Sequence, residues 1–122
     1  MVIKSFKDLR VWQLGMDLVE QIYLLTYDFP AHEVYSLTSQ MRRAAVSIPS
    51  NIAEGHTREH TAEYLHFLSL AQSSLAELQT QIEIAGRLKY LTPLHITQTL
   101  EQATSLSKQI YALRNAFTRQ KK

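Results

Sequence analysis

The fold of this chain is decided by residues 59–88, EHTAEYLHFLSLAQSSLAELQTQIEIAGRL. The apolar residues of this stretch recur at steps of three and four, which is the spacing of one face of an α-helix. They are Leu65, Leu68, Ala71, Leu75, Leu78, Ile82 and Ala85. The pattern therefore predicts one long helix over residues 59–88, with a single stripe that must be buried against other elements.

The next segment along the chain begins with the clearest helix start in the sequence, Thr92-Pro93. Threonine is a good N-cap, and proline suits the first helical position because its missing N–H has no partner there. We predict a helix over residues 93–119. Its apolar stripe comprises Ile96, Leu100, Ala103, Leu106, Ile110, Leu113 and Phe117.

On the N-terminal side, residues 32–54 predict another helix, which contains Pro49. Proline removes one amide donor and clashes with a carbonyl of the preceding turn, so we expect a kink. The step from Ile48 to Ile52 continues across it, which indicates one kinked helix rather than two elements. Gly55 fits the left-handed position that follows a helix. The stripe comprises Val34, Leu37, Met41, Ala44, Ala45, Ile48 and Ile52.

Residues 7–28 predict the first helix, opened by a capping box between Ser5 and Asp8 and ended by Phe29-Pro30. Two apolar rows run along it, which is more than one core contact needs. They comprise Leu9, Trp12, Met16, Val19 and Tyr23, and Val11, Leu14, Leu18, Ile22 and Leu25. A second row left in water exceeds what a monomer exposes. We therefore expect a homo-oligomer, with an interface that includes Trp12, Leu14, Leu18 and Ile22.

Four helices with short connections and no run of period two predict an all-α fold, an antiparallel up-down-up-down four-helix bundle. The 122 residues form one domain, residues 1–122. The chain has no cysteine, which excludes a disulfide scaffold, a zinc ribbon and a thiol nucleophile. No apolar run approaches a membrane span of ~20 residues. We expect a cytoplasmic protein with no membrane role.

The charge of the chain is mildly basic, +2 overall, but it is unevenly distributed. Residues 84–122 carry seven basic side chains and one acidic one, Glu101. One interpretation is a solvated helix face and a helix C-terminus that favours cations. The other is a surface that faces a polyanion.

Sequence patterns for catalysis or metal binding are weak. A di-iron bundle needs two Glu-x-x-His motifs, and only Glu63-Tyr64-Leu65-His66 is present. His56, Glu59 and His60 near it are more typical of a polar helix start than of a zinc site. No glycine-rich phosphate loop or nucleophile elbow occurs. We expect no enzyme activity, no cofactor and no metal.

Arg42-Arg43 stands out midway along the otherwise apolar segment of residues 32–54. Adjacent helical positions differ by about 100°, so the two guanidiniums should diverge. They either pair with carboxylates, of which the candidates are Asp17, Glu20, Glu77 and Glu83, or contact phosphate. Trp12, Phe6 and Tyr23 are either core and interface aromatics or stacking surfaces for bases. The candidate nucleic-acid residues are Arg42, Arg43, Lys4, Lys7, Arg10, Arg114, Arg119, Lys121 and Lys122.

Several of these stretches resemble the 23S rRNA intervening-sequence protein family. They are Phe6-Lys7-Asp8-Leu9-Arg10-Val11-Trp12, Tyr35-Ser36-Leu37-Thr38-Ser39-Gln40-Met41-Arg42-Arg43-Ala44-Ala45, and Ser47-Ile48-Pro49-Ser50-Asn51-Ile52-Ala53-Glu54-Gly55. The resemblance covers about residues 6–91. The chain departs from the family pattern at Gln72, where a small glycine is common, and at Gln79, where glutamate is common.

The resemblance implies a four-helix bundle with a connection to RNA, because some family members are encoded within intervening sequences of 23S rRNA genes. The family is also similar to the accessory variability determinant proteins of diversity-generating retroelements, which are homopentamers that bind nucleic acid and a reverse transcriptase. By this resemblance we expect a pentamer, a nucleic-acid partner and, by family analogy only, a reverse transcriptase. Overall we expect a non-catalytic, oligomeric nucleic-acid-binding or scaffold protein. The alternative is a protein–protein interaction module with no nucleic-acid role.

Overall fold

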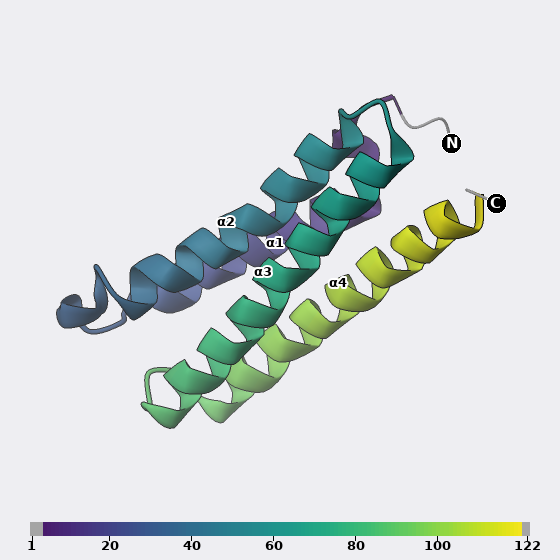
Figure 1. Ribbon diagram of the computed structural model, residues 1–122. Helices are drawn as coiled ribbons and strands as arrows, with labels where there is room; N and C mark the ends of the chain where they lie inside the picture. The colour runs from purple at the N-terminus through teal and green to yellow at the C-terminus, as the bar shows by residue number, and fades with distance from the viewer. Residues whose placement is uncertain (1–3, 121–122) are drawn as a thin grey trace.

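The computed structural model describes residues 4–120, and over that range it contains helices and no β-strand (Figure 1). The long helices are α1 (Arg10–Thr26), α2 (Leu37–His56), α3 (Thr61–Arg87) and α4 (Pro93–Gln120), and single-turn 3₁₀ helices η1 (Phe6–Asp8) and η2 (Ala31–Glu33) precede the first two. The all-α prediction is confirmed. No helix within the described range is long and apolar enough to cross a membrane.

Contacts between α1 and α2 show that these two helices run in opposite directions. Gly15 near the start of α1 packs against Pro49 in the second half of α2, whereas Tyr23 near the end of α1 lies under Arg42 in the first half of α2. In Figure 1 the first and last described residues lie at one end of the bundle, and the η2 segment and the α3–α4 turn lie at the other end.

The core lies between the four helices and is almost entirely aliphatic. Each long helix contributes side chains that are fully buried, as the three-to-four spacing requires. The largest of them are Leu18, Ile22, Met41, Ile48, Ile52, Leu68, Leu75, Leu78, Ile82, Leu106 and Ile110. The buried stripes predicted for α3 and α4 are largely confirmed.

The predicted oligomer interface on α1 is wrong for two of its four residues. Leu18 and Ile22 are both 0% exposed, so they have no surface to offer to another chain. Trp12 and Leu14 are partly buried against the same core. The helix is rotated so that the row containing Leu18 and Ile22 fills the bundle interior, and this rotation is set by packing against α2.

The start of α1 is built in two steps. The capping box between Ser5 and Asp8 is confirmed, but it caps the single turn η1 rather than the long helix. Leu9 is extended, with φ −72° and ψ 127°, and α1 begins at Arg10. The helix ends at Thr26 instead of Asp28, just before the Phe29-Pro30 break.

The structure shortens the predicted N-terminal end of α2. The chain between residues 31 and 36 forms η2 and a turn, and the helix begins at Leu37. Its N-cap residue is Ser36, and the carboxylate of Glu33 accepts a hydrogen bond from the amide of Leu37 at 3.4 Å. Val34, predicted in the buried stripe, therefore lies outside the helix and is 49% exposed.

At its other end α2 continues through Gly55 to His56, and no described glycine has a positive φ. The left-handed conformation predicted for Gly55 is therefore wrong. The reason for a glycine here is packing, since a Cβ on Gly55 would lie 2.7 Å from Cβ of Phe67 in α3.

Pro49 lies inside α2, and the prediction of one helix across it is confirmed. Proline leaves a carbonyl of the preceding turn without its amide donor. Side chains that follow the proline bond to neighbouring carbonyls of that turn. Ser50 Oγ donates to the carbonyl of Val46 at 2.8 Å, and Asn51 Nδ2 donates to that of Ser47 at 2.8 Å.

Candidate ligand-binding surfaces

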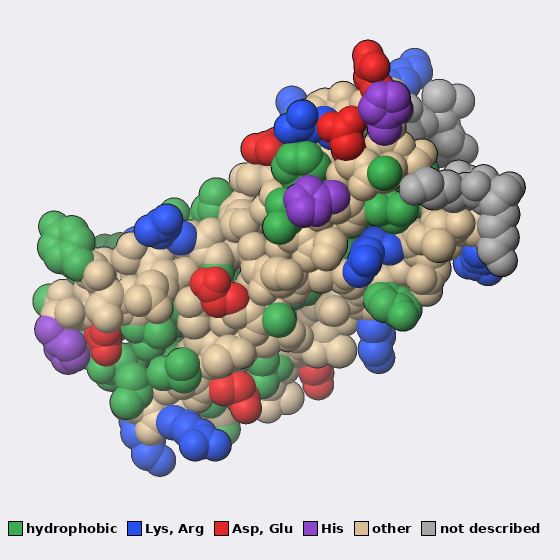
Figure 2. All heavy atoms as spheres, in the orientation of Figure 1, with side chains coloured by type: hydrophobic (Ala, Val, Ile, Leu, Met, Phe, Trp, Pro, Cys, Tyr) green, Lys and Arg blue, Asp and Glu red, His purple; other side chains and the backbone are tan. Residues whose placement is uncertain are grey.

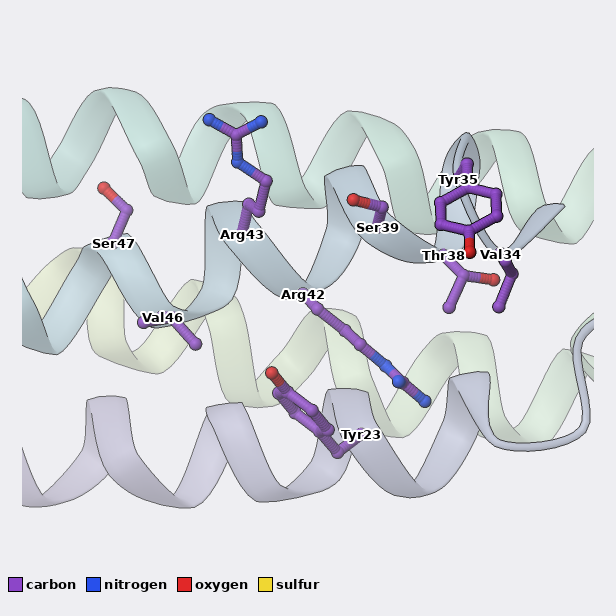
Figure 3. A pocket seen from close by; sticks show the side chains of 9 residues that line it. All are labelled: Tyr23, Val34, Tyr35, Thr38, Ser39, Arg42, Arg43, Val46 and Ser47. Carbon is purple, nitrogen blue, oxygen red and sulfur yellow. The ribbon is translucent and has the colours of Figure 1, made fainter.

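Arg42 and Arg43 point in opposite directions from α2, as the adjacent helical positions predict. Figure 3 shows Arg42 extending toward α1 and Arg43 toward α3. Arg42 therefore faces the groove between α1 and α2, whereas Arg43 lines that groove and also a second one between α2 and α3.

Arg42 is held in place by α1. Its Nε donates to Thr26 Oγ1 at 2.9 Å, and its guanidinium carbon lies 4.5 Å from the centre of the Tyr23 ring. Thr26 is itself 2% exposed and donates to the carbonyl of Ile22 at 2.7 Å. A cation over an aromatic face and a hydrogen bond to a fixed hydroxyl both restrict this side chain before any ligand arrives.

The ion pairs considered for these arginines do not form among residues 4–120. No carboxylate in that range lies within 4.0 Å of Arg42 or Arg43. Glu20 lines a cavity of about 520 Å³ beside Tyr23 and Arg42, and Glu77 lines the groove of Arg43, but neither makes a direct pair. Within the part of the chain that the structure describes, the two arginines are cations without a close counter-ion.

The groove beside Arg42 has a volume of about 610 Å³ and lies between α1 and the start of α2 (Figure 3). Nine residues line it, and none of them is acidic. Tyr35 stands at the end of the groove near η2 and is 96% exposed. Thr38 and Ser39 add hydroxyl groups to the wall.

The groove of Arg43 lies between α2 and α3 and is smaller, about 370 Å³. A polar network crosses it. Ser47 Oγ lies 2.8 Å from Ser74 Oγ, and it accepts a hydrogen bond from Asn51 Nδ2 at 2.9 Å. Arg43 and Glu77 flank this network. Because both signs of charge are present, this groove suits an anion less well than the groove of Arg42.

The other basic residues predicted from the sequence do not join these arginines. Arg10 begins α1, and 13 residues at 1.5 Å each place it about 20 Å from Tyr23 along the helix. Instead, Arg10 lines a shallow groove of about 360 Å³ with Ala112 and Leu113 of α4. The structure thus places Arg10 beside the second half of α4, the half that carries Arg114 and Arg119.

The described basic residues near the two ends of the chain are few. Lys4, Lys7, Arg10 and Arg119 are all exposed, whereas Lys121 and Lys122 lie outside the described residues. Figure 2 shows Lys and Arg side chains dispersed over the visible face, with acidic side chains between them.

Arg114 is partly buried and contributes to packing. Its Nη1 donates to Gln72 Oε1 across the α3–α4 contact. The departure from the family pattern at Gln72 thus has a structural consequence, because this longer side chain engages the arginine. Because of that bond, one N–H donor of Arg114 is not free to bind an external phosphate.

The structure shows an exposed apolar patch that the sequence patterns did not predict. We define the aromatic patch as the exposed apolar side chains at the end of the bundle where α1 meets η2 and α2. It comprises Tyr23 (43% exposed), Leu24 (72%), Tyr27 (83%), Val34 (49%), Tyr35 (96%) and Val46 (41%). Figure 2 shows hydrophobic side chains gathered at that end. In the sequence, the signal for this patch is the pair of tyrosines on either side of Phe29-Pro30, Tyr27 and Tyr35.

One hydrogen-bonded cluster fixes the segment that carries Tyr35. The hydroxyl of Tyr90, in the α3–α4 turn, donates to Glu33 Oε2 at 2.8 Å. This bond lowers the pKa of the Glu33 carboxyl and raises the pKa of Tyr90. The Tyr90 ring also packs against Phe29 at a centroid distance of 5.2 Å. The η2 segment is therefore anchored to a part of the chain far away in sequence.

The structure offers no metal centre within residues 4–120, since no three His, Asp or Glu side chains there are close enough to share an ion. Tyr64 is the other group with a shifted pKa, which burial raises to about 12. Its ring packs in the core against Phe117 at 4.9 Å between centroids.

The fold and these grooves define a four-helix bundle with arginine-lined surfaces. A family model described as 23S rRNA-intervening sequence protein matches residues 7–112. The chain therefore belongs to that family. It is also similar to a crystal structure from Bacteroides thetaiotaomicron, described as a protein with unknown function from the S23 ribosomal protein family. That similarity has a TM-score of 0.79 and 19% identity, and it covers 86% of this chain and 95% of that one. No curated protein matches the chain.

Proposed function

We propose that this protein is a non-catalytic, homo-oligomeric nucleic-acid-binding protein. The observation that carries the proposal is the pair Arg42 and Arg43, two adjacent cations with no carboxylate within 4.0 Å among residues 4–120. Arginine forks match phosphate oxygens, and phosphate contacts supply most of the affinity of sequence-independent binding. The family's link to 23S rRNA intervening sequences favours RNA as the first ligand to test.

Oligomerisation would compensate for the small number of cations on one chain. A ring repeats each basic site with its symmetry, so that weak sites become multivalent without any new contact. Leu24 and Tyr27 of the aromatic patch support self-association, because they are exposed, a tyrosine beside an apolar side chain is typical of interface centres, and neither lines the groove that contains Arg42 and Tyr35. The expectation that the ring has five subunits rests on the family resemblance alone. Light scattering at micromolar concentration tests this point, and a monomer would contradict it.

The test of nucleic-acid binding is a salt series with labelled single-stranded RNA and DNA. Arg43→Glu is the informative variant, because Arg43 is exposed and makes no internal hydrogen bond among the described residues. We expect weaker binding and a shallower dependence on salt, since each lost phosphate contact lowers the logarithmic slope by about 0.7 for single strands. Arg87→Glu, at the exposed end of α3, changes the net charge equally and serves as the control.

The alternative is a module that binds only protein, and the aromatic patch is the observation that favours it. In that case wild-type protein would bind neither RNA nor DNA at low salt. Arg42→Glu would still lower the melting temperature, because it breaks the bond to the buried Thr26 hydroxyl. A normal oligomer without nucleic-acid affinity would therefore refute the leading proposal.

A further inference from the structure

Arg42 combines a fixed position with donors that no described residue uses. A guanidinium has five N–H donors, and one of them, on Nε, goes to Thr26 at 2.9 Å. The four donors on the two Nη atoms have no hydrogen-bond acceptor among residues 4–120. Since contacts with Thr26 and Tyr23 already restrict the side chain, an anion that binds the fork avoids much of the usual ordering cost.

Tyr35 supplies a second feature of the same groove. It is an aromatic ring that is 96% exposed, and so it contributes little to the packing of this chain. The ring nevertheless lines the groove that contains Arg42 (Figure 3). The hydroxyls of Thr38 and Ser39 lie in the wall between them along the chain. An anion site and a free aromatic surface therefore face one volume of about 610 Å³.

The charge of this groove is complementary to a phosphate ester. It is lined by two arginines and by no acidic residue. Phosphate suits the arginine fork, and a nucleobase suits an exposed tyrosine, because every base has a face that stacks on an aromatic ring. Single strands and loops present such unstacked bases, whereas a duplex keeps them stacked inside.

We propose that this groove binds one nucleotide unit of a single-stranded nucleic acid, with the phosphate on Arg42 and the base stacked on Tyr35. The inference rests on the proposed function and adds the ligand class and the site. The shared chemistry is a nucleobase with a phosphate, whether it belongs to a strand or to a free nucleotide. The same arrangement predicts a preference for single strands over duplexes.

The experiment compares full-length wild-type protein, Tyr35→Ala and Tyr35→Phe by fluorescence anisotropy with labelled oligo(U) RNA, oligo(dT) and a duplex of equal length. Tyr111→Ala is the matched control, because Tyr111 is a 58% exposed tyrosine on α4. Loss of one base stack should weaken the binding of single strands by Tyr35→Ala about 5- to 150-fold. Tyr35→Phe and Tyr111→Ala should bind as wild type does, and duplex affinity should change less.

The possible outcomes separate this inference from the function on which it rests. If the wild-type protein binds single strands and Tyr35→Ala binds them equally well, the groove assignment is overturned while nucleic-acid binding stands. If the wild-type protein binds no nucleic acid at low salt, both the groove assignment and the proposed function are wrong. If adenosine monophosphate displaces the labelled strand with an affinity equal to that of the strand, the ligand of the groove is a free nucleotide, which offers the same base and phosphate. Equal competition by poly-glutamate would instead identify a site for acidic protein and overturn the inference.

Discussion

Replacing Gly55 by alanine should destabilise the bundle, even though alanine is the better helix former. A Cβ at this position would lie 2.7 Å from Cβ of Phe67 and 3.1 Å from Cδ1 of Tyr64. The first of these distances is about 0.7 Å short of 3.4 Å, where ordinary van der Waals contact begins. Because Cβ of Phe67 is fixed to its own backbone, α2 and α3 must move apart to accommodate the methyl group.

Two opposing contributions decide the magnitude. Overpacking of a close contact costs about 1–3 kcal/mol. Alanine in a helix interior is favoured over glycine by about 1 kcal/mol. The net change in the free energy of unfolding for Gly55→Ala is then a loss of up to about 2 kcal/mol. For a chain of this size the melting temperature should fall by up to about 10 °C.

The assay is thermal and urea denaturation followed by far-UV circular dichroism at one fixed protein concentration. Gly86→Ala is the matched control. Its Cβ would lie 2.6 Å from Cδ1 of Ile96, which is the flexible end of a side chain and can rotate away. That variant should be neutral or stabilised. A melting temperature of Gly55→Ala at or above that of the wild type would refute the reasoning.

Three further changes test the turns and the buried hydroxyl. Lys89→Gly should stabilise the protein by about 0.5–1 kcal/mol in urea denaturation, because Lys89 has a φ of 66° that glycine adopts without strain; a loss would contradict this. Tyr64→Phe should be neutral or stabilising by about 1 kcal/mol, because the hydroxyl is buried without a partner among residues 4–120; a clear loss of stability would show that a partner exists. Tyr90→Phe removes the main cause of the lowered pKa of Glu33. The wild type should therefore be more stable than this variant above pH 4.5 and lose that advantage as the pH falls through the lowered pKa; a difference that does not vary with pH would be evidence against it.

Most of the helices could be predicted from local patterns. The three-to-four spacing located α3 and α4 within two residues at each end. The Thr92 cap is confirmed, since its Oγ1 accepts the amide of His95 at 3.2 Å. The divergence of Arg42 and Arg43 follows from helix geometry alone. Periodicity, capping and side-chain direction are properties of a single helix, so the sequence determines them.

The start of α2 and the buried face of α1 needed the tertiary structure. The hydrogen bond that anchors Glu33 comes from Tyr90, which is 57 residues away. The apolar row of α1 that faces inward, which includes Leu18 and Ile22, is set by contacts with other helices, one of which is the approach of Gly15 to Pro49. Such contacts are made between distant parts of the chain, and no pattern within one segment records them.

The candidate site shows the same division. The sequence by itself determined that two arginines lie next to each other on a helix and point apart. Only the tertiary structure decided that Thr26 and Tyr23 hold Arg42, that no described carboxylate pairs with it, and that Tyr35 shares its groove. Individual helices of this length gain most of their stability from packing. For that reason the surroundings of each side chain are set by how the helices pack together rather than by the helix that carries it.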